Sequence, residues 1–361
     1  MKHRIRRRHV AGAIATAALV GTMPASSVNA TTTEHDSTRK PPTTKFDPTK
    51  IDKGKTRAAY VDGTVLHDGK KTLKLNVPHD VWDVHRLKRG YLVETDDPNS
   101  GWGVILYRVA PGGKVTKLRR FARQVWSIKV DSTGSKVAVQ IFTVNRGTPL
   151  TVFDAYTNKV IRRKNIGKNN VVHYGRGRML LTRGSETSTL SWYRPGNNKT
   201  KRIGKVPGWV QFADPGINLL GARGKGDAPS LVVRRFTQPR KNLWRFTSKE
   251  HIPDGIWFSP NGKYAVTSLS THDQPKLDTV TVRRVSDGAI VRRFKAPLFG
   301  TIGWENDRTL IIEAAAQQQA ARVRCTIGGT CTRVSRLVEG PSNFYALENL
   351  DTLLLDQKLF S

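Results

Sequence analysis

The sequence predicts an all-β protein, a seven-bladed β-propeller of four-stranded blades that occupies residues 57–361 as a single domain. Short β-branched and aromatic runs alternate with turns rich in Gly, Asn, Asp and Pro, and no stretch shows a helical period. One such unit recurs roughly every 38 to 48 residues, the blade length expected of a propeller repeat. Of the 361 residues 37% are hydrophobic, which excludes a collagen, a wholly disordered chain and a polytopic membrane protein.

Residues 1–30 predict a signal peptide. Residues 1–9 carry five Lys and Arg and no acid, and an apolar run of 14 residues follows, ending before Val28 and Ala30. A spanning helix needs about 20 apolar residues, so an uncleaved anchor is the less favoured alternative. We expect a secreted protein, extracellular or cell-wall associated, with no transmembrane anchor in the mature chain. General secretory and twin-arginine export both remain open.

Residues 31–56 are rich in Thr, Pro and Lys and predict a disordered tether ahead of the globular domain. Within the domain, each unit opens with a short aromatic-bearing run. These openings are residues 81–84, 125–128, 171–174, 209–212, 256–259, 302–305 and 344–347. A strongly apolar second strand follows each one. These second strands are residues 91–93, 137–139, 179–181, 217–219, 264–266, 310–312 and 353–355. Six or eight blades remain alternatives to seven.

The two ends of the domain predict how the ring closes. The seventh opening leaves only two strands before Ser361, and a hairpin of residues 64–67 and 72–75 precedes the first opening. We therefore expect a composite blade that takes two strands from each end. Such closure would leave the ring no free sheet edge between its first and last blades.

Residues 256–266, Ile-Trp-Phe-Ser-Pro-Asn-Gly-Lys-Tyr-Ala-Val, resemble the signature of WD40-like propeller repeats of the TolB type, and residues 130–139 are a looser copy. The resemblance implies a β-propeller and, as in many relatives, a periplasmic or secreted location. The dipeptide Trp82-Asp83 stands at a strand opening rather than a strand end, a departure from the eukaryotic WD40 pattern. This family has mixed functions, so the resemblance implies a fold rather than an activity.

Cys325 and Cys331 flank Gly328-Gly329, a hairpin signal that places the two cysteines on facing strands. In an exported protein this spacing predicts a disulfide. A zinc site is the alternative, but two Cys without a nearby His cannot supply four ligands.

The search for chemistry predicts no catalytic residue, no metal site and no cofactor, because no hydrolase, zinc-protease, phosphate-loop or calcium-loop motif occurs. Loops that rim a propeller face are the expected place for a ligand. The candidate ligand-face residues are His79, Asp80, Asp97, His272 and Asp273. A second set of carboxylates could line the channel mouth of a metal-assisted enzyme. These are Glu94, Asp96, Asp97, Glu186, Asp227 and Glu313.

Positive charge is concentrated on the predicted outermost strands. Seven windows cover these strands: residues 70–77, 114–121, 159–166, 199–206, 241–249, 289–296 and 330–337. They hold 23 Lys and Arg and no acid in 57 residues, where a proportional share would be about ten and five. The candidate polyanion-binding residues are Arg119, Arg120, Arg162, Arg163, Lys201, Arg202, Arg292 and Arg293. Protection of edge strands against pairing explains the same charges equally well.

These observations predict a secreted, non-enzymatic binding scaffold at the cell envelope, whose basic outer belt holds an anionic polymer and whose loop face binds a protein or glycan. No motif for sequence-specific nucleic-acid reading accompanies the charge. The alternative is a calcium-assisted hydrolase, lactonase or lyase that uses acidic residues on the channel-mouth loops.

Overall fold

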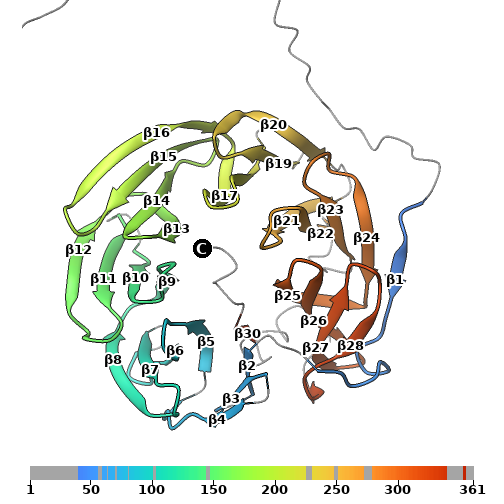
Figure 1. Ribbon diagram of the computed structural model, residues 1–361, viewed down its shortest axis with the longest axis horizontal. Helices are drawn as coiled ribbons and strands as arrows, with labels where there is room; N and C mark the ends of the chain where they lie inside the picture. Colours follow the sequence, from blue (N-terminus) through green and yellow to red (C-terminus); the bar gives the residue numbers. More distant parts are fainter. Residues whose placement is uncertain are drawn as a thin grey trace, which may run out of the picture.

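The computed structural model describes residues 40–55, 59–62, 64–69, 71–79, 81–100, 103–143, 147–224, 230–247, 251–271, 279–339 and 353–354. These residues contain strands and no helix. The strands form seven sheets arranged as a ring (Figure 1). The predicted seven-bladed propeller is confirmed, against six or eight blades.

Six blades are each built from consecutive strands. The inner strands are β5 (Val81–Arg86), β9 (Val125–Val130), β13 (Asn170–Gly175), β17 (Trp209–Asp214), β21 (His251–Phe258) and β25 (Leu298–Asn306). The second strands are β6 (Tyr91–Asp96), β10 (Lys136–Ile141), β14 (Arg178–Arg183), β18 (Leu219–Arg223), β22 (Tyr264–Thr271) and β26 (Thr309–Ala316). The predicted openings and second strands of these six blades fall in these strands, apart from the end of 256–259 and the start of 217–219.

The remaining strands complete the blades. The third strands are β7 (Val104–Val109), β11 (Pro149–Asp154), β15 (Thr187–Arg194), β19 (Ser230–Arg235), β23 (Thr279–Arg284) and β27 (Gln319–Thr326). The fourth strands are β8 (Val115–Phe121), β12 (Val160–Asn165), β16 (Lys199–Pro207), β20 (Gln238–Thr247), β24 (Ile290–Lys295) and β28 (Cys331–Arg333). A short β29 (Val338–Glu339) pairs with β27 beyond the end of β28.

The seventh blade closes the ring with strands from both ends of the chain, as predicted, but in a different division. Its order is β30 (Leu353–Leu354), β2 (Ala59–Asp62), β3 (Val65–Asp68) and β4 (Lys71–Lys74). Three strands therefore come from the N-terminal part and one from the C-terminal part. The run that forms β2 is four residues long, too short to show the alternation by which a strand is recognised. The opening predicted at 344–347 lies outside the described residues.

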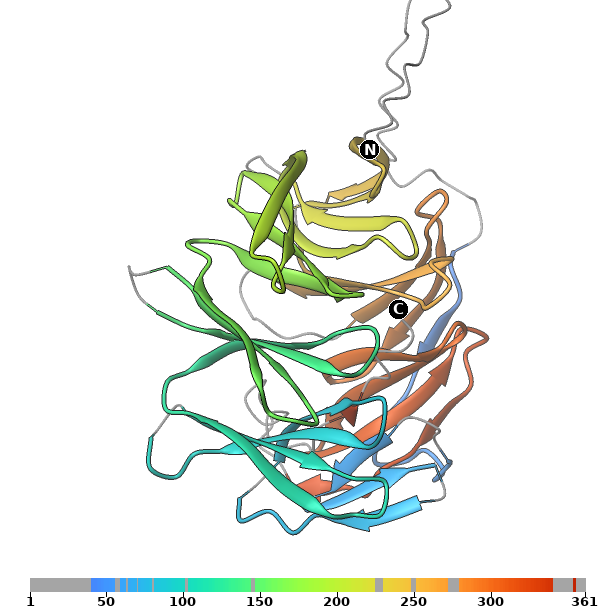
Figure 2. The same cartoon turned by 60° about the vertical axis from the view of Figure 1, so that its left-hand side comes forward.

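A fifth strand, β1 (Thr43–Lys45), lies along the outside of β24 and pairs with it in parallel (Figures 1 and 2). Further on, Gly54 N donates to Arg333 O at 2.6 Å, so the same segment also reaches β28. The expectation of a disordered tether over 31–56 therefore fails for this part of it. The sequence does not predict β1 because its Thr and Lys side chains show no apolar pattern. The strand forms through main-chain hydrogen bonds to the edge strand β24.

The motif residues of the two repeat copies form the turns between inner and second strands. The Asp131 carboxylate accepts two backbone N–H groups at 2.8 Å, and Ser259 Oγ accepts one at 3.0 Å. Gly134 has a φ of +66°, and a Cβ there would lie 2.3 Å from the backbone N of Lys88. Because Lys88 N donates to Gly134 O at 2.9 Å, this turn also contacts the preceding blade. Glycine is required at this position for two reasons: its φ is positive, and a Cβ would collide with the backbone of Lys88.

The hydrophobic core lies between neighbouring blades. Leu92 and Leu106 of one blade pack with Ile128, Val137 and Phe153 of the next, and all five are buried. Burying one such side chain stabilises the fold by about 1.5–3 kcal/mol. Each sheet therefore depends on a partner sheet on either side.

The predicted disulfide is confirmed: Cys325 of β27 and Cys331 of β28 lie directly opposite each other and are bonded. In the chain-entropy model, closing so short a loop contributes about 2 kcal/mol. The bond therefore holds one hairpin and leaves ring closure to other contacts.

One buried guanidinium, that of Arg322 on β27, spans the closure. Arg322 is 1% exposed, and its Nε lies 3.5 Å from Glu313 Oε1 on the facing strand β26. Its Nη1 donates to Val61 O of β2 at 3.2 Å, and its Cζ lies 5.7 Å from the Tyr60 ring centroid. The side chain thereby joins the last complete blade to the composite blade.

Replacing Arg322 tests this closure. We expect Arg322→Met to lower the free energy of unfolding by about 3–5 kcal/mol, because the buried Glu313 carboxylate loses its ion pair. Urea unfolding measures the loss. The control Arg308→Met removes an exposed arginine at a turn of the same sheet, where a change within about 0.5 kcal/mol is expected. Equal losses in the two variants would contradict a closing role for Arg322.

Candidate functional site at the upper face

We define the upper face as the end of the ring at which inner strands begin and second strands end. Because neighbouring strands are antiparallel, the connections between blades and between second and third strands lie at this end. The predicted ligand-face residues belong to these connections. Each of the six inner strands β5, β9, β13, β17, β21 and β25 also has a register shift near this face. Such bulges re-aim side chains and are frequent beside binding sites.

A cluster of metal-ligating side chains lies in the middle of the strand pair β5 and β6. One ligand atom each from Asp83, His85 and Glu94 lies within 4.8 Å of the others. Asp83 faces Glu94 directly across the strand pair, and His85 lies two residues along the same strand. Strand alternation therefore brings all three to one side of the sheet. His85 Nε2 lies 3.4 Å from Asp83 Oδ2.

Burial and like charge act together on Glu94. Desolvation, followed by the negative charges of Asp83 and Asp96, raises the pKa of Glu94 to about 8. The Glu94 side chain makes no hydrogen bond or ion pair with any residue that the structure describes. The carboxyl group is thus protonated over much of the neutral range, in an environment that favours a cation.

Two further titratable groups continue around the channel on β9 and β13. Burial lowers the pKa of Lys129, partly offset by the charge of Asp83. Burial, and then the positive charges of Lys129 and Arg178, lower the pKa of His173 to about 4. His173 is therefore neutral at physiological pH. Three successive inner strands thus place Asp83 within electrostatic range of Lys129, and Lys129 within range of His173.

Exposed aromatic side chains lie next to this arc. Trp126, at the bulge of β9, stacks on Phe142 with ring centroids 5.5 Å apart, and the two residues are 55% and 41% exposed. Trp209 begins β17 and is also exposed. Aromatic faces of this kind contact sugar or peptide groups through their flat apolar surfaces.

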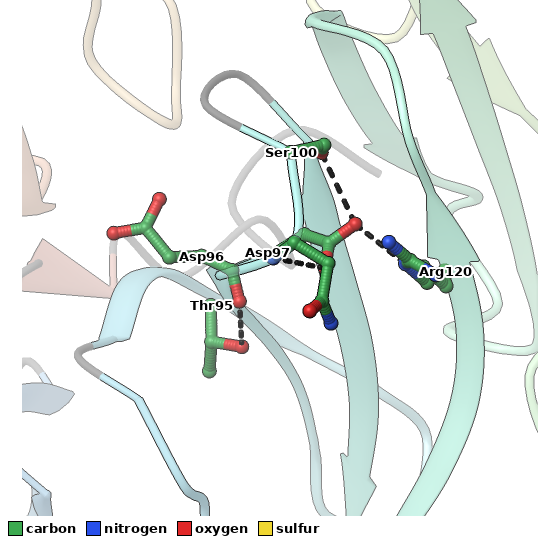
Figure 3. Close-up of polar contacts among 6 residues, drawn as sticks. Thr95, Asp96, Asp97, Ser100 and Arg120 are labelled. Atoms are coloured by element: carbon green, nitrogen blue, oxygen red, sulfur yellow. Dashed lines mark hydrogen bonds and ion pairs between the residues drawn. The ribbon is translucent and has the colours of Figure 1, made fainter.

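Asp97, predicted as a ligand-face residue, instead holds its own loop (Figure 3). Its carboxylate accepts from Arg120 Nε at 2.6 Å, from Ser100 Oγ at 3.1 Å and from Asn99 N at 3.2 Å. The hydrogen bond from Arg120 is the main cause that lowers the pKa of Asp97. Figure 3 shows the neighbouring Asp96 carboxylate pointing the opposite way. Of these two acids, only Asp96 remains available at the loop.

The other predicted loop residues do not form one site among the described residues. His79 is half-buried between β4 and β5. Asp80, Asp227, His272 and Asp273 lie outside the described residues. Glu313 pairs with Arg322 as described, so it does not line a channel mouth.

Three arginines of the predicted outer belt bind the neighbouring blade. Each lies on a fourth strand and donates to main-chain carbonyls in or beside the outer hairpin turn of the next blade: Arg119 to Asn158, Arg162 to Pro195 and Gly196, and Arg292 to Ile327. Arg119 also lies over the Phe153 ring, 5.0 Å from its centroid. With Arg120 on Asp97, at least four of the eight candidate residues have structural partners. In the sequence, these contacts are indicated by Arg-Arg pairs that recur at the same position of three repeats.

The remaining candidates are Arg163, Lys201, Arg202 and Arg293. Arg293 lies on β24 beneath the pairing with β1 and is only partly exposed. Lys201 and Arg202 are exposed on β16, next to a groove of about 440 Å³ between β16 and β20. The groove is lined by Ile203, Gly204, Lys205, Gln238, Pro239, Arg240 and Lys241.

Comparisons with known proteins support the fold. No protein-family model and no curated protein sequence matches the chain. A solved structure of a functionally unknown protein from Desulfotomaculum acetoxidans is similar, with TM-score 0.51, 14% identity and coverage of 83% of this chain and 99% of that one. TolB from Acinetobacter baumannii has TM-score 0.44, 15% identity and coverage of 65% and 61%. Hsv2 from Kluyveromyces lactis has TM-score 0.46, 13% identity and coverage of 69% and 75%.

The β-propeller fold that the resemblance implied is confirmed by the ring of seven sheets. Within the described residues, no helix has the length and apolar character needed to cross a membrane.

The arginine contacts between blades can be tested with one matched pair. We expect Arg162→Gln to lower the free energy of unfolding by about 1–2 kcal/mol, because Pro195 O and Gly196 O lose a charged donor. Arg163→Gln removes the same charge from an exposed neighbour and is expected to change stability by less than about 0.5 kcal/mol. Chemical denaturation compares the two, and equal losses would contradict the inter-blade role.

Glu94 predicts a pH dependence of stability, measured with chelator present. Its pKa is raised in the folded state, so between about pH 5 and pH 8 the unfolded chain releases a proton that the folded chain retains, and stability falls. One pKa unit is about 1.4 kcal/mol, so even half of the shift amounts to about 2 kcal/mol. Glu94→Gln should lose about that much less stability than the wild type over this range. Parallel pH profiles of the two proteins would show that Glu94 titrates normally.

Proposed function

We propose that the protein is a secreted, non-enzymatic propeller that binds an anionic polymer of the cell envelope through the outer surface of β16 and β20. The observation that carries this proposal is the basic groove between these strands. Lys201, Arg202, Lys205, Arg240 and Lys241 are exposed there, and none of them pairs with an acid among the described residues. Neither strand contains Asp or Glu.

The spacing of the charges suits a linear polyanion. Lys199 and Lys201 lie about 7 Å apart on one side of β16, and the bulge at Ile203 turns Lys205 to the side of Arg202, so a row of cations runs along the strand on both of its sides. Repeating phosphate or carboxylate groups along a polymer can meet such a row in succession. Each phosphate contact releases counterions, so the affinity would fall steeply with salt. Wall phosphate polymers, lipopolysaccharide and extracellular DNA all carry this chemistry.

The distribution of partners favours β16 and β20 over the whole circumference. One arginine on each of β8, β12 and β24 is engaged with the next blade, and β1 covers β24. The groove is also the place where two basic outer strands contact each other. Protection of edge strands against pairing remains the competing explanation, and it requires no ligand.

The enzymatic alternative has less support. A metal-assisted hydrolase of the expected kind needs carboxylates from several blades that converge on the axis. Within the described ranges, the one group of metal-ligating side chains found comes from a single blade, on β5 and β6.

The binding proposal is tested with charge reversals of equal size. The triple variant Lys201→Glu/Lys205→Glu/Arg240→Glu should weaken retention on purified envelope at low ionic strength by at least about tenfold. The slope of log affinity against log salt concentration should fall by the equivalent of about three phosphate contacts. The control Lys88→Glu/Arg89→Glu/Arg176→Glu makes the same charge change at exposed turns between inner and second strands, away from the groove. It should alter retention less than about threefold.

The source of the polyanion is identified by comparing intact walls, walls stripped of phosphate polymers, lipopolysaccharide vesicles and mixed-sequence DNA. Absence of retention of the wild type on all four would overturn the proposal and leave the edge-protection role. An equal loss of retention in both triple variants would contradict binding at the groove and show that net charge alone causes retention.

A further inference from the structure

The cluster of Asp83, His85 and Glu94 has the donor types of a transition-metal site. It offers one imidazole nitrogen and two carboxylate oxygens, whose ligand atoms lie within 4.8 Å of one another. Zn²⁺ binds His nitrogen and carboxylate oxygen at about 2.0–2.2 Å, which places two ligands of a tetrahedral ion about 3.4 Å apart. The 3.4 Å between His85 Nε2 and Asp83 Oδ2 matches this separation. A small closing movement of Glu94 would complete a three-ligand set.

The first two ligands are already held in place. Val84 N donates to Asp83 Oδ1 at 2.7 Å, which leaves Oδ2 directed at His85. The His85 side chain is 6% exposed and packed within the sheet. Such preorganisation of ligands raises metal affinity, because little order is lost on binding.

Glu94 supplies an independent observation. Its carboxyl group is largely buried beside two other carboxylates, yet no hydrogen bond or ion pair from a described residue satisfies it. A buried carboxylate without a partner is costly to the fold. A bound cation would compensate Glu94 and Asp83 together. The core leucines Leu92 and Leu106, across from His85 and Glu94, supply the apolar surroundings.

Access from solvent is provided by Asp83. Its side chain is 44% exposed, whereas that of His85 is buried, so an ion can enter from the Asp83 side. With three protein ligands, a fourth coordination position would remain on that side for water or for a ligand group.

We propose that Asp83, His85 and Glu94 bind one divalent transition-metal ion, with Zn²⁺ as the representative, between the inner two strands of the blade β5–β8. The site differs from the calcium site expected on the channel-mouth loops, since its ligands stand on strands and include an imidazole. Ca²⁺ takes six to eight oxygen ligands and has little use for a nitrogen donor. This proposal is independent of polyanion binding, which lies on the outer circumference.

Metal titration of the chelator-treated mature protein tests the site. We expect one Zn²⁺ per chain by calorimetry, a raised thermal midpoint with Zn²⁺ but not with Ca²⁺, and visible absorption bands when Co²⁺ replaces Zn²⁺. Glu94→Gln and Asp83→Asn should each raise the dissociation constant for Zn²⁺ at least about tenfold. Glu94→Gln keeps the shape of the side chain and is neutral like the protonated carboxyl group, so this variant is expected to fold.

His173→Asn is the matched control, because it removes a channel histidine that lies outside the cluster. Its dissociation constant for Zn²⁺ should stay within about twofold of the wild type. Zn²⁺ binding that is unchanged by both cluster variants would overturn the site and indicate surface histidines. Equal stabilisation by Ca²⁺ and Zn²⁺ would overturn the transition-metal class, and no binding of either ion would overturn the proposal altogether.

Discussion

The ring depends on the buried guanidinium of Arg322, where chain segments about 260 positions apart must meet. Every other blade neighbours a blade that precedes or follows it directly, so local connection keeps the two together. Only the composite blade requires strands from the two ends of the chain to come together. A charge-assisted hydrogen bond to Val61 O gives this contact a direction that apolar packing alone lacks, and Glu313 balances the buried charge. Closure is therefore specific as well as favourable.

Arginine has a second structural use on the outer circumference. Arg119, Arg162 and Arg292 each join a fourth strand to the outer turn of the next blade. In the blade β17–β20, Trp244 does the same, because its Nε1 donates to Val285 O at 3.0 Å. Much of the basic belt is thus a repeated contact between blades. Among the described residues, Lys201, Arg202, Lys205, Arg240 and Lys241 on β16 and β20 are exposed and pair with no acid, and the binding proposal is centred there.

The sequence reveals those parts of the fold that depend on apolar burial. Inner and second strands are recognisable because runs such as those of β10 and β26 are buried on both faces. Strand β1 is not predicted from the sequence, because its three residues bury little apolar surface and its position depends on pairing with the edge strand β24. The Asp83–His85–Glu94 cluster is also missed, although Glu94 is named, because the register between β5 and β6 is what places Glu94 opposite Asp83. The outer arginines are visible, but their partners are backbone carbonyls of other blades.

The position of β1 sets an order on folding. Thr43 pairs with Arg293, so a segment near the beginning of the polypeptide docks on one that is synthesised some 250 residues later. During synthesis this early segment remains undocked while the following five blades are made. Contacts of such long range form slowly, because the loop-closure entropy is lost before any packing is gained. Attachment of β1 is therefore one of the last steps of maturation and reports that the ring beneath it is already assembled.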